Sequence, residues 1–211
     1  MKKRVLGLGK DFLLACMAGV SISVGCVAYL SSGSKIIGSL VFAVGLFMII
    51  FLNFNLYTGK ICFALGKKPS YILDLAVIWL GDFLGAAGSA QILSLTRLSS
   101  LYNVAKGVVA AKLTDGFLSL FVLGVCCNIM IFLAVYGVAN FKGEIAKMLA
   151  LLFGVSIFVL CGFEHCVADM FYFTFARAWS FDAILRILVI TLGNTVGGLL
   201  VPVVMKITKK D

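Results

Sequence analysis

Polar residues interrupt two membrane-length apolar runs of this chain, at places about a hundred residues apart. The first interruption is Asn53-Phe54-Asn55-Leu56-Tyr57-Thr58-Gly59, and the second is Cys161-Gly162-Phe163-Glu164-His165. Polar side chains and irregular backbone are costly at membrane depth, and they are tolerated there only where protein buries them or where they line a cavity. Paired interruptions in two halves of a chain are therefore typical of a transport site near the middle of a bilayer.

The composition indicates an integral membrane protein with a single transmembrane domain over residues 1–211. Of the 211 residues, 62% are hydrophobic and 13% are charged, and the mean hydropathy is +1.13. A soluble domain is about half apolar and about a quarter charged. The net charge of +9 has no soluble basic surface on which to lie, which argues against a nucleic-acid partner.

Six membrane-spanning segments fit the apolar pattern, because each has the roughly 20 apolar residues that a helix needs to cross a bilayer. Their expected limits are residues 12–30, 35–66, 71–96, 116–139, 147–176 and 183–207. The second and fifth are longer than one crossing, which predicts a helix, a loop and a half-helix in each. Of the 18 Lys and Arg residues, twelve lie on one side of this arrangement and six on the other. This asymmetry predicts both termini in the cytoplasm and a location in the inner membrane of the cell.

The third and sixth segments share a sequence motif. Residues 80–85 read Leu-Gly-Asp-Phe-Leu-Gly, and residues 192–197 read Leu-Gly-Asn-Thr-Val-Gly. Close helix packing explains the glycines, but it does not explain why Asp82 aligns with Asn194. We therefore expect two three-helix repeats, over residues 12–97 and 112–207. Because each repeat has an odd number of crossings, the second copy is inverted, which is a transporter architecture.

The polar residues at the two interruptions are the candidates for function. His165 is the only histidine, and an intramembrane His at a helix break is expected to donate hydrogen bonds or protons in a pore. Thr58 is expected to cap the helix after the first break, to place a hydroxyl opposite His165, or both. The polar residues that we expect to hold the broken segments by hydrogen bonds, away from the pore, are Glu164, Asp82, Asp169, Asn128 and Asn194.

The sequence contains no pattern that is typical of an enzyme or of a metal site. It has one His, no Cys-x-x-Cys pair and no P-loop. We therefore expect no cofactor, no metal and no catalytic activity. A membrane thiol oxidoreductase that uses Cys161 and Cys166 is an alternative of another class. A neutral-solute pore of aquaporin type lacks support, because the paired Asn-Pro-Ala loops are absent.

These residues together resemble the formate/nitrite transporter family. Residues 162–171, Gly-Phe-Glu-His-Cys-Val-Ala-Asp-Met-Phe, are similar to the family's G-F-E-H-S-I-A-N-M-F stretch. Residues 55–59 are similar to its [E/D]-L-F-T-[G/S] pattern, and residues 192–198 form a third matching motif. The resemblance extends from Phe12 to Met205. It implies an aquaporin-like fold, a homopentamer, and a pore for small monovalent anions through each protomer.

The resemblance also implies roles for residues that composition alone would assign to the core. It makes Thr58 and His165 the central pore pair. It assigns the outer hydrophobic constriction to Phe42 and Phe158, the inner constriction to Leu46 and Tyr57, a basic residue that attracts anions to Lys147, and the helix asparagines to Asn128 and Asn194.

Some positions depart from the family pattern and bear on the substrate. Asn55, in the first break, stands where the family has an acidic residue, and Asp82 stands where it has an Asn. Lys60 follows the first break closely, and the amino terminus and the loops are short. These departures resemble the hydrosulfide channel branch more than the formate or nitrite branches. The expected substrate is therefore hydrosulfide, with formate or nitrite passage, or anion–proton symport, as the alternatives.

Overall fold

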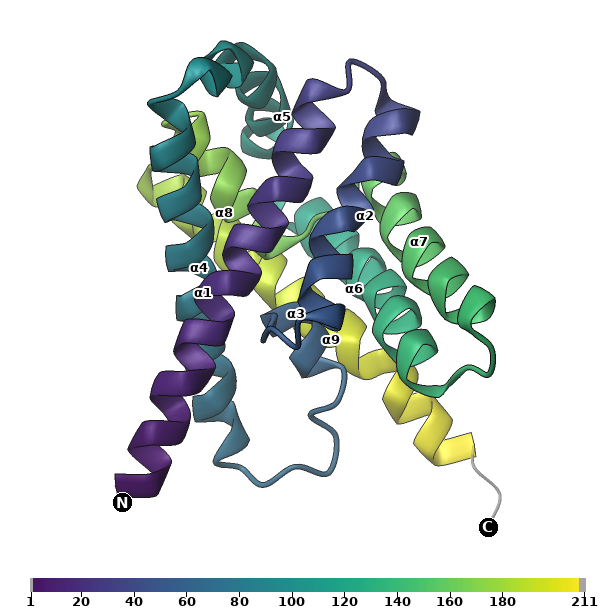
Figure 1. Cartoon of the computed structure of the whole chain (residues 1–211). Helices are drawn as coiled ribbons and strands as arrows, with labels where there is room; N and C mark the ends of the chain where they lie inside the picture. The colour runs from purple at the N-terminus through teal and green to yellow at the C-terminus, as the bar shows by residue number, and fades with distance from the viewer. Residues whose placement is uncertain (1, 209–211) are drawn as a thin grey trace.

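The computed structural model describes residues 2–208, and the regular structure in that range is helical (Figure 1). The helices are α1 (Lys2–Ser31), α2 (Lys35–Phe51), α3 (Tyr57–Ile61), α4 (Tyr71–Ser94), the 3-10 helix η1 (Arg97–Leu101), α5 (Tyr102–Thr114), α6 (Phe117–Asn140), α7 (Glu144–Cys161), α8 (Cys166–Phe175) and α9 (Phe181–Thr208). Within residues 2–208, five helices are long and apolar enough to cross a membrane, and α2 and α8 are apolar but shorter. This confirms an all-helical, membrane-type fold. The six-crossing inverted repeat stays a prediction.

The long second and fifth segments are each divided into two helices, and the two divisions have the same local geometry. Asn53 and Gly162, just after α2 and α7, adopt left-handed conformations with φ of 56° and 72°. In each case the next backbone amide donates to a carbonyl near the helix end, at 2.9 Å, from Phe54 to Ile49 and from Phe163 to Phe158. A left-handed residue with this hydrogen bond is a common way for a helix to end. The polar interruptions in the sequence are therefore helix ends, after which α3 and α8 begin.

Glycines of the repeated motif bring the long helices into close contact. α1 packs on α4, and α6 packs on α9. A Cβ atom on Gly85 would collide with the backbone of Cys16 in α1, and a Cβ atom on Gly197 would collide with the backbone of Val125 in α6. Only glycine allows backbones to approach so closely. The same packing therefore supports both breaks, since α3 contacts α4 and α9, and α8 contacts the same two helices.

The segment between α4 and α6 is helical, although the prediction placed no membrane-spanning segment in residues 97–115. The structure has η1 and α5 there. The buried residues of α5 are Ala105, Val109 and Lys112, which lie on one face of the helix. At 13 residues, α5 is too short to cross a membrane. It packs on α8 and α9, at the end of the bundle opposite the start of α1 (Figure 1).

The helix ends also differ in places from the apolar limits. α1 begins at Lys2, well before residue 12, because a helix can continue beyond the apolar layer of a membrane. The start of α1 and the end of α9 lie at the same end of the bundle (Figure 1).

Candidate functional site

The two helix breaks meet at a hydrogen bond between Thr58 and His165. Oγ1 of Thr58, in α3, lies 2.9 Å from Nε2 of His165, which directly precedes α8. Both residues are buried, with exposures of 0% and 2%. The structure thus brings together two polar side chains that are 107 positions apart, one from each break.

His165 also determines how α8 begins. Its Nδ1 accepts a hydrogen bond from the backbone N–H of Ala168 at 3.2 Å, which makes His165 the N-cap residue of α8. Because a backbone N–H can only donate, Nδ1 carries no proton, and the proton of the neutral ring lies on Nε2. Nε2–H therefore donates to Oγ1 of Thr58, and this bond does not use the hydroxyl proton of Thr58. Thr58 is not a cap itself, because Leu56 occupies that position of α3.

Aromatic rings cover the His165 side of this pair. The rings of Phe42 and Phe158 meet edge to face, with centroids 5.8 Å apart, and Phe158 stacks on His165 at 5.6 Å. All three line a cavity of about 80 Å³, which also contacts Lys112 and Asp169 and which we call the second-break pocket.

Another cavity lies on the Thr58 side. It has a volume of about 230 Å³, and its lining includes Leu46, Leu56, Gly59 and Lys60; we call it the first-break pocket. Leu56 and Gly59 flank the segment that carries Thr58, whereas His165 lines the second-break pocket. The Thr58–His165 hydrogen bond therefore lies where the two pockets approach each other.

Tyr57 and Leu46, which the prediction pairs at an inner constriction, line different cavities in the part of the chain that the structure describes. The Tyr57 hydroxyl lies 2.8 Å from Oγ1 of Thr195, and the side chain lines a separate apolar cavity of about 890 Å³ between α4 and α9. Leu56 takes the place beside Leu46 in the first-break pocket. The reason is local: neighbouring residues at the start of a helix point in different directions, and α3 directs Tyr57 towards α9.

Asn55 and Lys147 also lie outside both break pockets. Asn55 is buried, and its Nδ2 donates to Oδ1 of Asp11 in α1 at 2.9 Å. Lys147, near the start of α7, pairs with the exposed Glu144 one turn earlier, at 2.8 Å. A role for Asn55 or Lys147 in attracting or passing anions stays a prediction. Asn55 joins the first break to α1, and Lys147 is a surface residue whose charge is partly offset.

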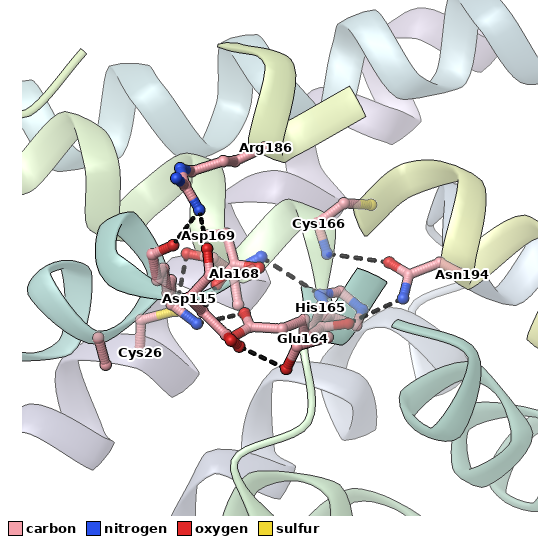
Figure 2. A network of polar contacts seen from close by, with 12 residues as sticks. Cys26, Asp115, Glu164, His165, Cys166, Ala168, Asp169, Arg186 and Asn194 are labelled. Atoms are coloured by element: carbon pink, nitrogen blue, oxygen red, sulfur yellow. Dashed lines mark hydrogen bonds and ion pairs between the residues drawn. The ribbon is translucent and has the colours of Figure 1, made fainter. Parts of the chain in front are cut away.

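A buried amide holds the second break in position. Oδ1 of Asn194, in α9, accepts a hydrogen bond from the backbone N–H of Cys166 at 3.0 Å. Nδ2 of Asn194 donates to the carbonyl oxygens of Glu164 and Gly124, at 2.8 and 2.9 Å. One side chain therefore links α9, α6 and the first residue of α8 (Figure 2).

Two buried polar side chains hold the first break. Oδ2 of Asp82, in α4, accepts from the backbone N–H of Tyr57 at 2.8 Å. Nδ2 of Asn128, in α6, donates to the carbonyl oxygen of Thr58 at 3.1 Å. Both ends of the short segment 57–58 are thus bonded to long helices.

A buried cation that the sequence pattern did not reveal lies beside the second break. Nζ of Lys112 forms ion pairs with Glu164 and with Asp169, the latter at 2.8 Å. The three residues are 9%, 5% and 1% exposed. Nη1 of Arg186 donates to the carbonyl oxygens of Lys112 and Asp115, which anchors the end of α5 (Figure 2). Buried charges at membrane depth persist when they are paired, so this cluster joins α5 to the break.

The burial of Lys112 could have been predicted from the sequence, but the prediction used this residue only as a basic residue that reports the orientation of the chain in the membrane. The prediction counted Lys112 among the six basic residues on the outer side. Ala105, Val109 and Lys112 follow one face of a helix, and that spacing places Lys112 with two apolar side chains that pack inward. Lys112 is therefore a buried ion-pair partner, and it does not report topology.

Comparisons with known proteins agree on the family. A model of the formate/nitrite transporter family matches residues 1–208. The formate channels FocA and FocB of Escherichia coli (strain K12) are 28% and 25% identical, over 77% and 79% of this chain and 64% and 66% of their own lengths. This chain thus spans about two thirds of the length of these curated relatives. A solved pentameric formate channel with formate bound is 26% identical, with a TM-score of 0.83, and the match covers 95% of this chain and 96% of that one. Because the family match includes both breaks and every described helix, the chain belongs to the formate/nitrite transporter family.

Proposed function

We propose that this protein is a channel for small monovalent anions, with formate as the first candidate, and that it works as a homopentamer with a pore in each protomer. The observation that carries the proposal is the buried Thr58–His165 hydrogen bond at the meeting point of two helix breaks. Relatives named as formate channels, and a similar solved structure described as pentameric with formate bound, support the substrate class and the assembly.

The site lowers the cost of moving an anion through an apolar constriction. An anion without water in such a slot is very unfavourable. The hydroxyl proton of Thr58, which the Thr58–His165 bond leaves free, is the donor that replaces water in this proposal, and Nε2–H of His165 donates to the anion when it turns away from Oγ1 of Thr58. α8 begins at Cys166, directly after His165, so the positive end of its helix dipole adds to the attraction.

The cap bond of His165 favours hydrogen bonding over proton release. A protonated ring would carry a proton on Nδ1 and would lose the bond from the Ala168 amide. Loss of the Nε2 proton from a neutral ring would leave a buried anion, which desolvation disfavours. In our proposal His165 therefore stays neutral, and a proton that crosses with the anion travels on the substrate.

An inverted repeat and six crossings are part of this proposal. The two breaks share their helix-end geometry, and the pairing of α1 with α4 matches the pairing of α6 with α9. We count α2 with α3, and α7 with α8, as one composite crossing each. Six crossings place both termini on one side of the membrane, which the bundle in Figure 1 supports, and the basic residues place that side in the cytoplasm.

The choice between formate and hydrosulfide needs a direct measurement. Lys60 lines the first-break pocket and no acidic residue does, an arrangement that favours anions in general and does not choose among them. The test is a flux panel in liposomes, with formate, nitrite, hydrosulfide and chloride at several pH values. We expect formate to pass well above protein-free liposomes and well above chloride. Hydrosulfide passage without formate passage would restore the hydrosulfide prediction, and no anion flux from an assembled oligomer would contradict the proposal.

The thiol oxidoreductase alternative is tested in the same liposomes. Cys161 is exposed and Cys166 is buried at the start of α8. We expect the double variant Cys161→Ser, Cys166→Ser to keep its anion flux. Loss of flux with the oligomer intact would give the thiols a part in the function.

A further inference from the structure

Asp82 and Asn194 make equivalent hydrogen bonds at the two breaks. Oδ2 of Asp82 accepts from the backbone N–H of Tyr57, the first residue of α3, at 2.8 Å. Oδ1 of Asn194 accepts from the backbone N–H of Cys166, the first residue of α8, at 3.0 Å. Both side chains are 0% exposed. The alignment of residues 80–85 with 192–197 therefore holds in space as well as in sequence.

The two sites differ at the other polar atom of each side chain, which is Nδ2 in Asn194 and Oδ1 in Asp82. Nδ2 of Asn194 donates to the carbonyls of Glu164, in the loop before α8, and of Gly124, in α6. Oδ1 of Asp82 is also buried, but within residues 2–208 no group donates to it. An ionised carboxylate at this position would therefore keep one oxygen without a partner.

The repeat indicates what Oδ1 of Asp82 faces. The residues that correspond to Glu164 and Gly124 are Asn55, in the loop before α3, and Ala15, in α1: the Asn55 N–H donates to Leu14 as the Glu164 N–H donates to Leu123. Ala15 packs against Gly81, directly before Asp82, in the way that Gly124 packs against Gly193, directly before Asn194. The Ala15 carbonyl lies inside α1, where it accepts the backbone hydrogen bond of the helix. The Asn55 carbonyl lies in a loop and accepts no backbone hydrogen bond from the described residues, which leaves it as the acceptor that needs a donor.

No cation offsets a charge on Asp82. None of the ion pairs in the part of the chain that the structure describes includes it. The titratable groups that face it are thiols, Cys16 on α1 and Cys166 on α8, together with the backbone amide of Tyr57 on α3. An isolated carboxylate among carbonyl oxygens at membrane depth is far more costly than a neutral acid.

We propose that Asp82 is a neutral carboxylic acid in the folded protein and that its hydroxyl donates to the carbonyl of Asn55. Asp82 then holds the first break as the Asn194 amide holds the second, by accepting from the first amide of the helix and donating to a carbonyl of the preceding loop. Because Thr58 directly follows Tyr57, Asp82 is a positioning residue for the Thr58 hydroxyl. At alkaline pH its ionisation would replace a donor by a second acceptor, repel the loop carbonyl and displace α3. The Thr58 half of the site is therefore pH-sensitive through Asp82, whereas the amide that holds the His165 half does not titrate.

Infrared spectroscopy tests the protonation state without reference to transport. We expect the wild-type protein, purified at neutral pH, to show the carbonyl band of a protonated carboxyl group, and we expect the Asp82→Asn difference spectrum to lack it. Asparagine fits this position, because it supplies the acceptor for Tyr57 and the donor for Asn55. A difference spectrum without a carboxylic acid band, or a variant that no longer assembles, would overturn the proposal.

Stability against pH adds a readout that a merely structural side chain would not change. As pH rises above about 5, the unfolded chain ionises this carboxyl while the folded chain keeps it neutral, so the melting temperature of the wild type should fall. Asp82→Asn should flatten that fall, and the matched swap Asn194→Asp should introduce a second one. Identical pH slopes in wild type and Asp82→Asn would contradict the proposal.

The part of the inference that concerns Thr58 rests on the proposed function. With Asp82→Asn, anion flux in liposomes should persist to higher pH than in the wild type. If neither protein transports anions, the proposed function fails while the spectroscopic and stability results still decide the state of Asp82. If both transport with the same pH profile, Asp82 does not position Thr58.

Discussion

Replacing Lys112 with Met should strongly destabilise the protein, because it leaves Glu164 and Asp169 buried without a cation. The Lys112–Asp169 pair is 2.8 Å long, for which Coulomb's law gives a gross attraction of about 6 kcal/mol at an effective dielectric constant of about 20. Desolvation offsets part of this attraction, and removing one partner of a buried pair costs about 3–5 kcal/mol. For a chain of this length each kcal/mol lowers Tm by roughly 2–4 °C, so we expect a fall of roughly 6–20 °C.

The assay is thermal denaturation of the purified oligomer in detergent, read as loss of the assembled species on size-exclusion chromatography. Glu164→Gln and Asp169→Asn each leave Lys112 with one carboxylate, so each should cost less than Lys112→Met. The triple variant, with all three substitutions, has no charge left to bury and should recover much of the lost stability. A wild-type Tm in Lys112→Met, or a triple variant as unstable as the single one, would refute the view that an unpaired buried charge causes the loss.

Three further predictions concern the candidate pore and the assembly. His165→Ala should abolish most anion flux in liposomes and cost about 1 kcal/mol through the lost cap, whereas His165→Asn should recover the cap but not the flux; a transporting His165→Ala would remove His165 from the mechanism. Thr58→Val keeps the side-chain volume and removes the hydroxyl, so flux should fall while the oligomer stays intact, and unchanged flux would place Thr58 outside the pore. Native mass spectrometry in mild detergent should show five copies of the chain, and a monomer or trimer would contradict the proposed assembly.

The helix breaks could be predicted from the sequence because polar residues inside a membrane-length apolar run are costly unless the helix is interrupted there. Asn53 and Gly162 stand at the ends of apolar runs, and both residue types adopt the left-handed conformation that ends a helix. The pairing of Thr58 with His165 was also within reach, since each lies at a break. The structure shows that pairing as a hydrogen bond of 2.9 Å, whereas a pore role for either residue stays a prediction.

The direction of individual side chains could not be predicted in the same way. Leu56 and Tyr57 are neighbours, and which of them faces the first-break pocket depends on how α3 is rotated against α6 and α9. Asn55 turns to Asp11 for a similar reason, because the loop before α3 passes close to α1. One residue of rotation at the start of α3 decides whether Leu56 or Tyr57 lines the first-break pocket.

The amino-acid sequence was enough to predict a helical membrane protein, the places where two of its segments break, and the matching positions of Asp82 and Asn194. These features follow from local hydropathy and from a repeated motif, which need no knowledge of neighbouring elements. Helix packing was needed to find that Lys112 is buried with Glu164 and Asp169, and that Oδ1 of Asp82 has no donor among the described residues. The physical reason is that the stability of a buried charge depends on partners from other helices, and packing alone brings those partners within reach.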